Sequence, residues 1–302
     1  MSEIIVSQQL IKTFSEWIHN YMGHKVHMSD ILLEKRIKNV CDNLGLLDLD
    51  SAINFFENTK ENQRVIQAAA KEFSVNESYF FRDKTFFENF EKYLLPSFIN
   101  SKEKKIHIWS VGCSRGEELY SIAILLKEHI KDLDQWDICL LGTDIDPDVL
   151  KSAQKGVFSK WSLRETPQIY MKYFKKDGNL FCIDKELLLM CNFSYHNLIS
   201  YRYPPLICNN GMFDMVLAKN IMIYFDAKEN EQVVHFLFNH IKFGGWFCTS
   251  ASEFQLVLMK KVFVYESNIM PIIQKKSLPL VTEIPVDLDI NDEETQIEGF
   301  NE

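Results

Sequence analysis

The chain has 302 residues, of which 46% are apolar, enough for one large hydrophobic core or two smaller ones. It has no run of 18 apolar residues and begins with acidic and polar side chains, so we expect neither a membrane span nor a secretory signal. Residues 277–302 contain eight acids and no Lys or Arg, which leaves the rest nearly neutral and disfavours nucleic acid as a partner. The seven cysteines lack any C-x-x-C spacing, which favours reduced thiols in a cytoplasmic protein.

The first 75 residues show helical periodicity and no strand pattern. Four helices are predicted, over residues 8–22, 29–44, 49–60 and 62–74, and Gly23 and Gly45 end the first two. We therefore expect an all-α domain over residues 1–75. His24 and His27 follow the first helix without nearby partners, and we expect both to lie on the surface.

From Lys105 onward, strands and helices alternate. Apolar strands are predicted near residues 105–111, 137–144, 213–219 and 244–252, with helices over 117–130, 147–156 and 227–241. This alternation predicts a parallel, doubly wound α/β sheet. Residues 157–200 break the rhythm, and "LFCID" and "MCNFSYHN" suggest a small antiparallel insert. The expected organisation is an α/β domain over residues 76–276, with the insert at about 175–196, and an acidic, disordered tail over 277–302.

The stretch "SVGCSRGEELYS" joins the first strand to its helix. Gly112 and Gly116 let the backbone approach a ligand closely, but neither the dinucleotide fingerprint nor the P-loop pattern is met. Two acids at the helix start argue against phosphate and favour a cationic or hydroxyl-rich ligand. The alternative is that Glu117 and Glu118 only stabilise the helix N-terminus through its dipole.

Asp144 ends the next strand, 28 residues after Gly116. An acid at that position of a nucleotide-binding α/β sheet takes ribose hydroxyls. The alternative, a helix cap, is better filled by Asp146, which precedes Pro147. An acidic ribose site without a phosphate cradle suggests a nucleoside lacking phosphates, such as S-adenosylmethionine, whose ammonium group Glu117 or Glu118 could receive.

Two further stretches are candidates for the site. "NESYFFRD", residues 76–83, joins the two domains, and its alternative role is an interdomain wedge with a surface ion pair. "LAKNIMIYFD", residues 217–226, places Lys219, Asn220 and Tyr224 after a strand, where ligand contacts are expected. The eight histidines lack ligand spacing, so no metal site is expected.

Taken together, these stretches resemble the chemotaxis receptor methyltransferases, the CheR family. "NESYFFRD" is similar to N-[ET]-T-x-F-F-R-[DE], "WSVGCSRGEELYSIA" to W-S-A-[GA]-C-S-x-G-E-E-x-Y-S-[IL]-A, and "FDMVLAKNIMIYFD" to F-D-[VL]-[IV]-x-x-R-N-V-[ML]-I-Y-F-D. "GTDIDPDVLKSAQKGVFS" and "IKFGGWFCTSASE" also resemble family motifs, and the likeness runs in order from about residue 10 to residue 273.

The resemblance implies a Rossmann-like class I methyltransferase sheet with a small β insert, preceded by the all-α domain. It implies transfer of a methyl group from S-adenosylmethionine to glutamate side chains of chemoreceptors, leaving S-adenosylhomocysteine and tuning chemotactic adaptation. The implied partner is the cytoplasmic helical domain of chemoreceptors. We expect the protein to be a monomer that neither inserts into the membrane nor binds nucleic acid. The implied cofactor contacts are Asn76, Ser78, Arg82, Gly112, Glu117 or Glu118, Asp144, Asn197, Leu198, Lys219 and Asn220, and Arg82 and Tyr224 are the expected catalytic residues.

Departures from the family pattern keep other functions open. Ser78 replaces the usual Thr, Leu119 a frequent Pro, and Lys219 an Arg, which turns a bidentate fork into a point charge. The alternatives are a methyltransferase with another acceptor and a non-catalytic module that binds the cofactor. A nicotinamide dehydrogenase is disfavoured by the glycine pattern.

Overall fold

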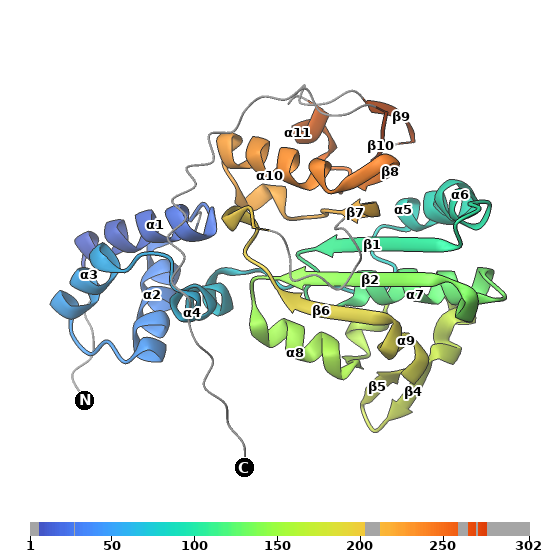
Figure 1. The fold of residues 1–302 in the computed structure, drawn as a ribbon. Helices are drawn as coiled ribbons and strands as arrows, with labels where there is room; N and C mark the ends of the chain where they lie inside the picture. Colours follow the sequence, from blue (N-terminus) through green and yellow to red (C-terminus); the bar gives the residue numbers. More distant parts are fainter. Residues whose placement is uncertain (1–5, 27, 203–211, 259–264, 270, 277–302) are drawn as a thin grey trace, which may run out of the picture.

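The computed structural model describes residues 6–26, 28–202, 212–258, 265–269 and 271–276. The predicted acidic tail and His27 lie outside the described residues. The chain begins with an all-α module and continues into an α/β domain (Figure 1).

The all-α module contains α1 (Gln8–Met22), α2 (Asp30–Leu44), α3 (Leu49–Asn58) and α4 (Gln63–Phe73). The helices α1, α3 and α4 begin at side-chain caps, as where Asn62 accepts from two backbone N–H groups of α4. Gly23 and Gly45 end α1 and α2 in the left-handed conformation. The apolar faces bury a core of their own, built around Phe14, Trp17 and Phe56.

The α/β domain is built on a seven-stranded sheet. Its strands are β1 (Lys105–Val111), β2 (Asp137–Asp144), β6 (Cys191–Tyr195), β7 (Phe213–Leu217), β8 (Ile241–Cys248), β9 (Tyr265–Ile269) and β10 (Ile272–Lys275). The strand order is β6-β2-β1-β7-β8-β10-β9. The first five strands in this order pair in parallel, whereas β10 pairs antiparallel to both β8 and β9.

Helices cover both faces of this sheet because the side chains of each strand alternate between the faces. Ile106 and Ile108 of β1 pack into the cluster that holds α5 (Lys84–Asn89), α6 (Leu95–Ile99), α7 (Glu117–His129) and α8 (Pro147–Lys155). Trp109 and Val111 pack on the other face with α10 (Ala227–Asn239) and α11 (Phe254–Leu258). The fold class predicted from the sequence is therefore confirmed.

The antiparallel insert begins earlier than predicted. It consists of β3 (Val157–Ser159), β4 (Phe174–Asp177) and β5 (Leu180–Ile183), in the order β3-β5-β4. The helix α9 (Lys185–Met190) then leads into β6, which pairs in parallel with β2. Placing "MCNFSYHN" in the insert was therefore wrong. β6 is an edge strand with only one buried face, so its residues alternate as they do in an antiparallel strand.

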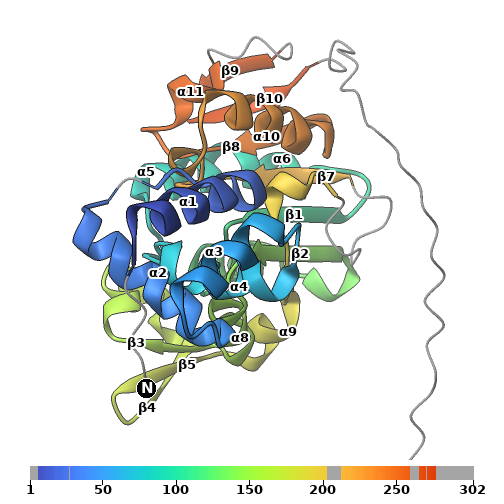
Figure 2. The same ribbon diagram turned by 90° about the vertical axis from the view of Figure 1, so that its left-hand side faces the viewer.

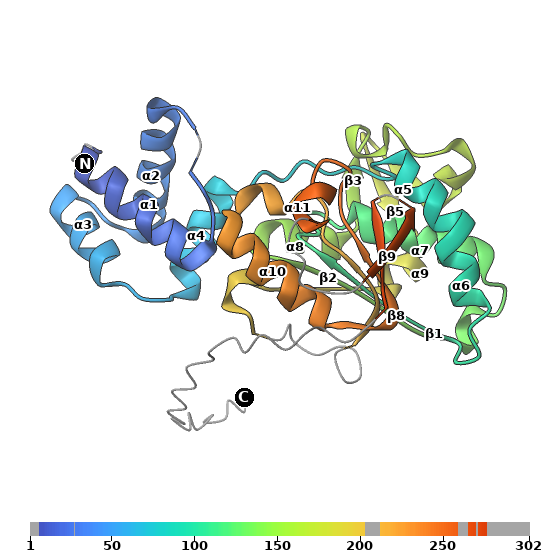
Figure 3. The same ribbon diagram turned by 90° about the horizontal axis from the view of Figure 1, so that it is seen from above.

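The all-α module lies beyond the carboxyl ends of the parallel strands. Figure 2, seen from the module's side, has α1–α4 in front of the strand ends, and Figure 3 shows the module to one side of the α/β domain. Hydrogen bonds join the two parts. The Lys25 N–H donates to the Tyr224 carbonyl at 2.9 Å, and the Asn197 side chain donates to the Tyr21 carbonyl at 2.8 Å.

The cysteines depart from the prediction at one described position. Cys41, Cys113, Cys182, Cys191 and Cys248 are free thiols. Cys139 is disulfide-bonded, so the expectation of reduced thiols throughout was wrong there. Cysteine spacing along a sequence does not reveal which thiols pair.

Candidate functional site

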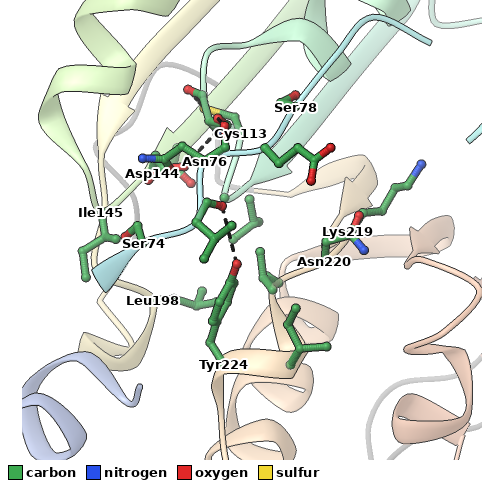
Figure 4. A pocket seen from close by; sticks show the side chains of 18 of the residues that line it. Ser74, Asn76, Ser78, Cys113, Asp144, Ile145, Leu198, Lys219, Asn220 and Tyr224 are labelled. Carbon is green, nitrogen blue, oxygen red and sulfur yellow. Dashed lines mark hydrogen bonds between the residues drawn. The ribbon is translucent and has the colours of Figure 1, made fainter. Parts of the chain in front are cut away.

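A cavity of ≈ 300 Å³ lies at the carboxyl edge of the sheet, where the all-α module meets it (Figure 4). Met22 and His24 line it from the module. The cavity gathers side chains and backbone from every stretch that the sequence singled out. The predicted site residues that line it are Asn76, Ser78, Arg82, Gly112, Glu118, Asp144, Asn197, Leu198, Lys219, Asn220 and Tyr224; Glu117 does not.

The turn after β1 requires both of its glycines. Gly112 has φ +65°, and a Cβ there would lie 2.5 Å from Cγ2 of Ile221. Gly116 has φ +85°, and a Cβ would lie 2.7 Å from the Phe193 ring. Ser114, between them, also has a positive φ of 51°. Left-handed non-glycine residues are costly and concentrate at functional sites, so this turn is held in shape by the surrounding structure.

Asp144 shapes this turn from the end of β2. One carboxylate oxygen accepts from the Ser114 N–H at 2.8 Å and the other from the Asp146 N–H at 3.0 Å. Burial raises the pKa of Asp144 to about 6. Asp146 caps α8 and accepts from the Asn76 side chain at 2.8 Å. As predicted, the helix cap is therefore Asp146, and Asp144 is left at the cavity wall.

The two glutamates at the start of α7 have different surroundings. Glu118 lines the cavity, where the Ser110 hydroxyl donates to it at 2.9 Å. Glu117 is fully buried and is not among the residues that line the cavity, and the Ser78 and Ser162 hydroxyls lie close to its carboxylate. Burial raises the pKa of Glu117. The carboxylate available to a ligand in this cavity is therefore that of Glu118.

The linking segment, residues 76–83, acts both as a wedge and as part of the cavity wall. Phe80 and Phe81 are buried, with Phe80 packed edge-on against Phe158 at 4.7 Å. The Phe81 N–H donates to the Ser121 hydroxyl of α7 at 3.0 Å, and the Phe80 N–H donates to the Ser162 carbonyl at 2.9 Å. These contacts fix the backbone on which Arg82 lines the cavity.

The alternative role of residues 76–83 included a surface ion pair between Arg82 and Asp83, and this expectation was wrong. Asp83 pairs with Lys219 instead. The Lys219 ammonium lies 3.3 Å from Asp83 and 3.6 Å from Glu118, with only 4% of its side chain exposed. It also lies 4.0 Å from the centroid of the Phe86 ring. Lys219 therefore links the segment over residues 76–83 to the Glu118 carboxylate at the cavity wall.

Glu253 is a functional residue that sequence reasoning missed. It is fully buried, and its carboxylate accepts from the backbone N–H groups of Asn220, Met222 and Ile223 at 2.6, 2.8 and 3.3 Å. The Ser250 hydroxyl also donates to it at 2.6 Å. Asn220 has φ 60°, so Glu253 holds a strained turn that carries Asn220 and Tyr224. The available signal was the Ser-Glu pair that ends "TSASE".

His24 is the second missed residue, and the expectation that it lies on the surface was wrong. It is only 9% exposed and lines the cavity. Its ring stacks on Tyr224, with centroids 5.1 Å apart and planes at 25°. Burial lowers the pKa of His24 to about 4 and raises that of Tyr224, so both rings are neutral near pH 7. The burial of His24 depends on its contact with Tyr224, which the sequence around Gly23 cannot reveal.

One group outside the cavity has the composition of a metal site. His19, Asp226 and Glu229 bring ligand atoms within 4.8 Å of one another. The Asp226 carboxylate already accepts from two N–H groups at the start of α10, and His19 lies 3.8 Å from Glu229 as an ion pair would. Among the described residues, every helix is too short or too polar to span a bilayer.

Comparisons with known proteins identify the family. A family model described as "CheR methyltransferase, SAM binding domain" matches residues 76–266. A "Chemotaxis protein methyltransferase" of Borreliella burgdorferi is 30% identical over 246 residues, which cover 78% of this chain and 84% of that protein. The "Chemotaxis protein methyltransferase 2" of Vibrio cholerae is 29% identical and covers 84% and 88%. That of Escherichia coli K12 is 27% identical and covers 75% and 77%. The chain therefore belongs to the CheR methyltransferase family and is an S-adenosylmethionine-dependent methyltransferase.

Proposed function

We propose that this protein methylates glutamate side chains on the cytoplasmic helices of chemoreceptors, giving glutamyl methyl esters and thereby tuning chemotactic adaptation. The names of its relatives support a chemotaxis substrate. The observation that carries the proposal is that Glu118 and Asp144, from two adjacent strand–helix turns, line one cavity. This pairing suits a ligand with a positive charge at one end and ribose hydroxyls at the other.

The residues present fit S-adenosylmethionine. In this proposal Asp144 would accept from the ribose hydroxyls, and Glu118 would accept from the ammonium group. Asn197 and Leu198 would flank the adenine, and the backbone around Gly112 would approach the nucleoside. When bound, the cofactor supplies a methyl group on a positively charged sulfur.

The acceptor needs little chemical activation. A glutamate with a pKa of about 4.3 is already ionised near pH 7, so no general base has to remove a proton. Arg82 lines the cavity and can attract the incoming carboxylate. The stacked rings of Tyr224 and His24 line the cavity and would help to exclude water from it. Catalysis then rests mainly on holding the carboxylate oxygen in line with the methyl group.

The all-α module, residues 1–75, is the proposed receptor-docking domain. Lys35, Arg36 and Lys38 lie on α2, whose other face is packed in the module's core. Three basic residues on one helix suit the acidic surface of a helical receptor. We expect the protein to act in the cytoplasm as a monomer.

Incubation with a chemoreceptor cytoplasmic fragment and methyl-labelled S-adenosylmethionine tests the proposal. We expect label in the fragment that alkali releases as methanol, because glutamyl methyl esters are base-labile. A fragment with Gln at the methylated positions is the matched control and should take up little label. Alkali-stable label, or label only in small molecules, would assign another acceptor; S-adenosylhomocysteine binding without transfer to any receptor would indicate a non-catalytic module.

A further inference from the structure

Arg164, at the edge of the β insert, is stacked between two aromatic rings. Its guanidinium carbon lies 3.6 Å from the centroid of the Tyr79 ring and 4.1 Å from that of Trp161. One of its nitrogens donates to the Trp161 carbonyl at 2.8 Å. Its side chain is 20% exposed, so the group is fixed in orientation yet reachable from solvent. A guanidinium held in this way loses little conformational freedom when it binds a carboxylate.

This stack borders the cavity. Tyr79 lines the cavity, and the guanidinium of Arg82, another lining residue, lies 5.7 Å from the same ring. Arg82 also donates to the Glu77 carbonyl. Two guanidinium groups therefore share the Tyr79 ring, one in the cavity wall and one on the insert. Neither the cofactor contacts described above nor the transfer of the methyl group uses Arg164.

The Arg164 guanidinium already pairs with a carboxylate, that of Glu77, which indicates the kind of ligand it can bind. Glu77 lies 3.4 Å from Arg164, but 61% of its side chain is exposed. An ion pair that exposed is weak and exchangeable. Residues 157–183, which form the insert, contain five Lys or Arg and two acids, so its charge also favours an acidic partner. Trp161, 68% exposed, and Ile223, 56% exposed on the cavity rim, add apolar contact area.

We propose that Arg164, held by Tyr79 and Trp161, is a specificity-determining residue that binds a second acidic side chain of the acceptor, one helical turn from the glutamate that is methylated. This rests on the proposed function, since residues three or four apart share one face of a helix. Glu77 occupies the same guanidinium when no acceptor is bound, and the acceptor displaces it.

The test measures kcat and KM for two receptor fragments that differ only in the acidic residue one turn from the methylated glutamate, present or replaced by Gln. With the acid present, we expect Arg164→Gln to raise KM roughly tenfold, the loss of one partly exposed charge-assisted contact. For the fragment in which Gln replaces this acid, the wild-type enzyme should show the same raised KM, and Arg164→Gln should raise KM little further. Glu77→Gln should lower KM, because the competing carboxylate is gone.

Two controls separate this role from others. Lys160→Gln removes a nearby exposed charge of the same insert and should leave KM within about twofold, since a fully screened surface charge contributes little. The affinity of Arg164→Gln for S-adenosylhomocysteine should equal that of the wild type. An equal rise in KM on both fragments, or a parallel loss of S-adenosylhomocysteine affinity, would overturn the inference. If the wild-type enzyme labels neither fragment, the proposed function itself is refuted. The acceptor on which Arg164 is proposed to act is then refuted with it.

Discussion

In its proposed role Asp144 must be ionised to accept from both ribose hydroxyls, yet burial opposes its ionisation. Its pKa in the folded protein is raised to about 6, so the protonated fraction grows as pH falls through 6. We expect affinity for S-adenosylhomocysteine to be constant above about pH 7 and to weaken below pH 6, approaching about tenfold per pH unit. Calorimetry between pH 5 and 8 measures this.

The control for that profile is Asp144→Asn, which cannot titrate and should bind weakly at every pH. The stability contribution of Asp144 has the opposite sign. A folded pKa above the unfolded value means that this group stabilises the fold most at low pH and loses that contribution as pH rises through 6. Unfolding driven by Asp144 therefore cannot explain weaker binding at pH 5, and an affinity that is flat down to pH 5 would contradict the assignment.

Lys219 joins two carboxylates that would otherwise repel each other. Replacing it in Lys219→Met leaves Asp83 and Glu118 without their shared cation. We expect a loss of about 2 kcal/mol in the free energy of unfolding, below the usual value for a fully buried pair because both acids are partly exposed. Lys219→Arg should retain stability and cofactor affinity, since the fork can serve both acids. Thermal unfolding that is unchanged in Lys219→Met would show that the pair contributes nothing.

At the scale of elements, the turn over residues 220–224 depends on Glu253. Glu253→Ala removes the acceptor of three backbone N–H groups, which we expect to cost about 3 kcal/mol of stability. Because this turn carries Tyr224, kcat should fall as well. Glu253→Gln keeps one carbonyl oxygen and should lie between the wild type and Glu253→Ala in both measurements. Full activity of Glu253→Ala would rule out the positioning role.

The glycines that end α1 and α2 are a matched pair for testing the contact between the all-α module and the α/β domain. Gly23 and Gly45 both end helices with positive φ, but a Cβ on Gly23 would lie 2.7 Å from Ile199, whereas one on Gly45 meets nothing within 4 Å. Gly45→Ala should cost about 1 kcal/mol from backbone strain alone. Gly23→Ala should cost more and should also weaken S-adenosylhomocysteine binding, because Met22 and His24 are displaced from the cavity. Equal effects of the two substitutions on binding would contradict this contact.

At the scale of the whole molecule, strand–helix alternation was enough to predict the parallel sheet, because buried parallel strands are continuous apolar runs. It was also enough to predict which turns meet, since the carboxyl ends of parallel strands share one edge. The insert boundary was misjudged because the edge strand β6 alternates. The hairpin of β9 and β10, which completes the sheet, was not predicted at all.

The remaining failures concern contacts between segments distant in the chain. The sequence could not choose between Glu117 and Glu118, because adjacent helix residues differ only in the direction they face, about 100° apart. It could not reveal that His24 stacks on Tyr224, 200 positions away, or that Glu253 reaches back to Asn220. In each case the partner is set by how the all-α module or a later strand packs, which no local pattern records.

The central claim is that one cavity binds a positively charged sulfur nucleoside through Glu118 and Asp144. Calorimetry of the full chain with S-adenosylmethionine, S-adenosylhomocysteine and NAD tests it most directly. We predict binding of the first two and not of NAD, with roughly tenfold or greater weakening for both nucleosides in Glu118→Gln, the loss of a charge-assisted hydrogen bond. Binding of NAD alone, or unchanged affinity in Glu118→Gln, would contradict the account.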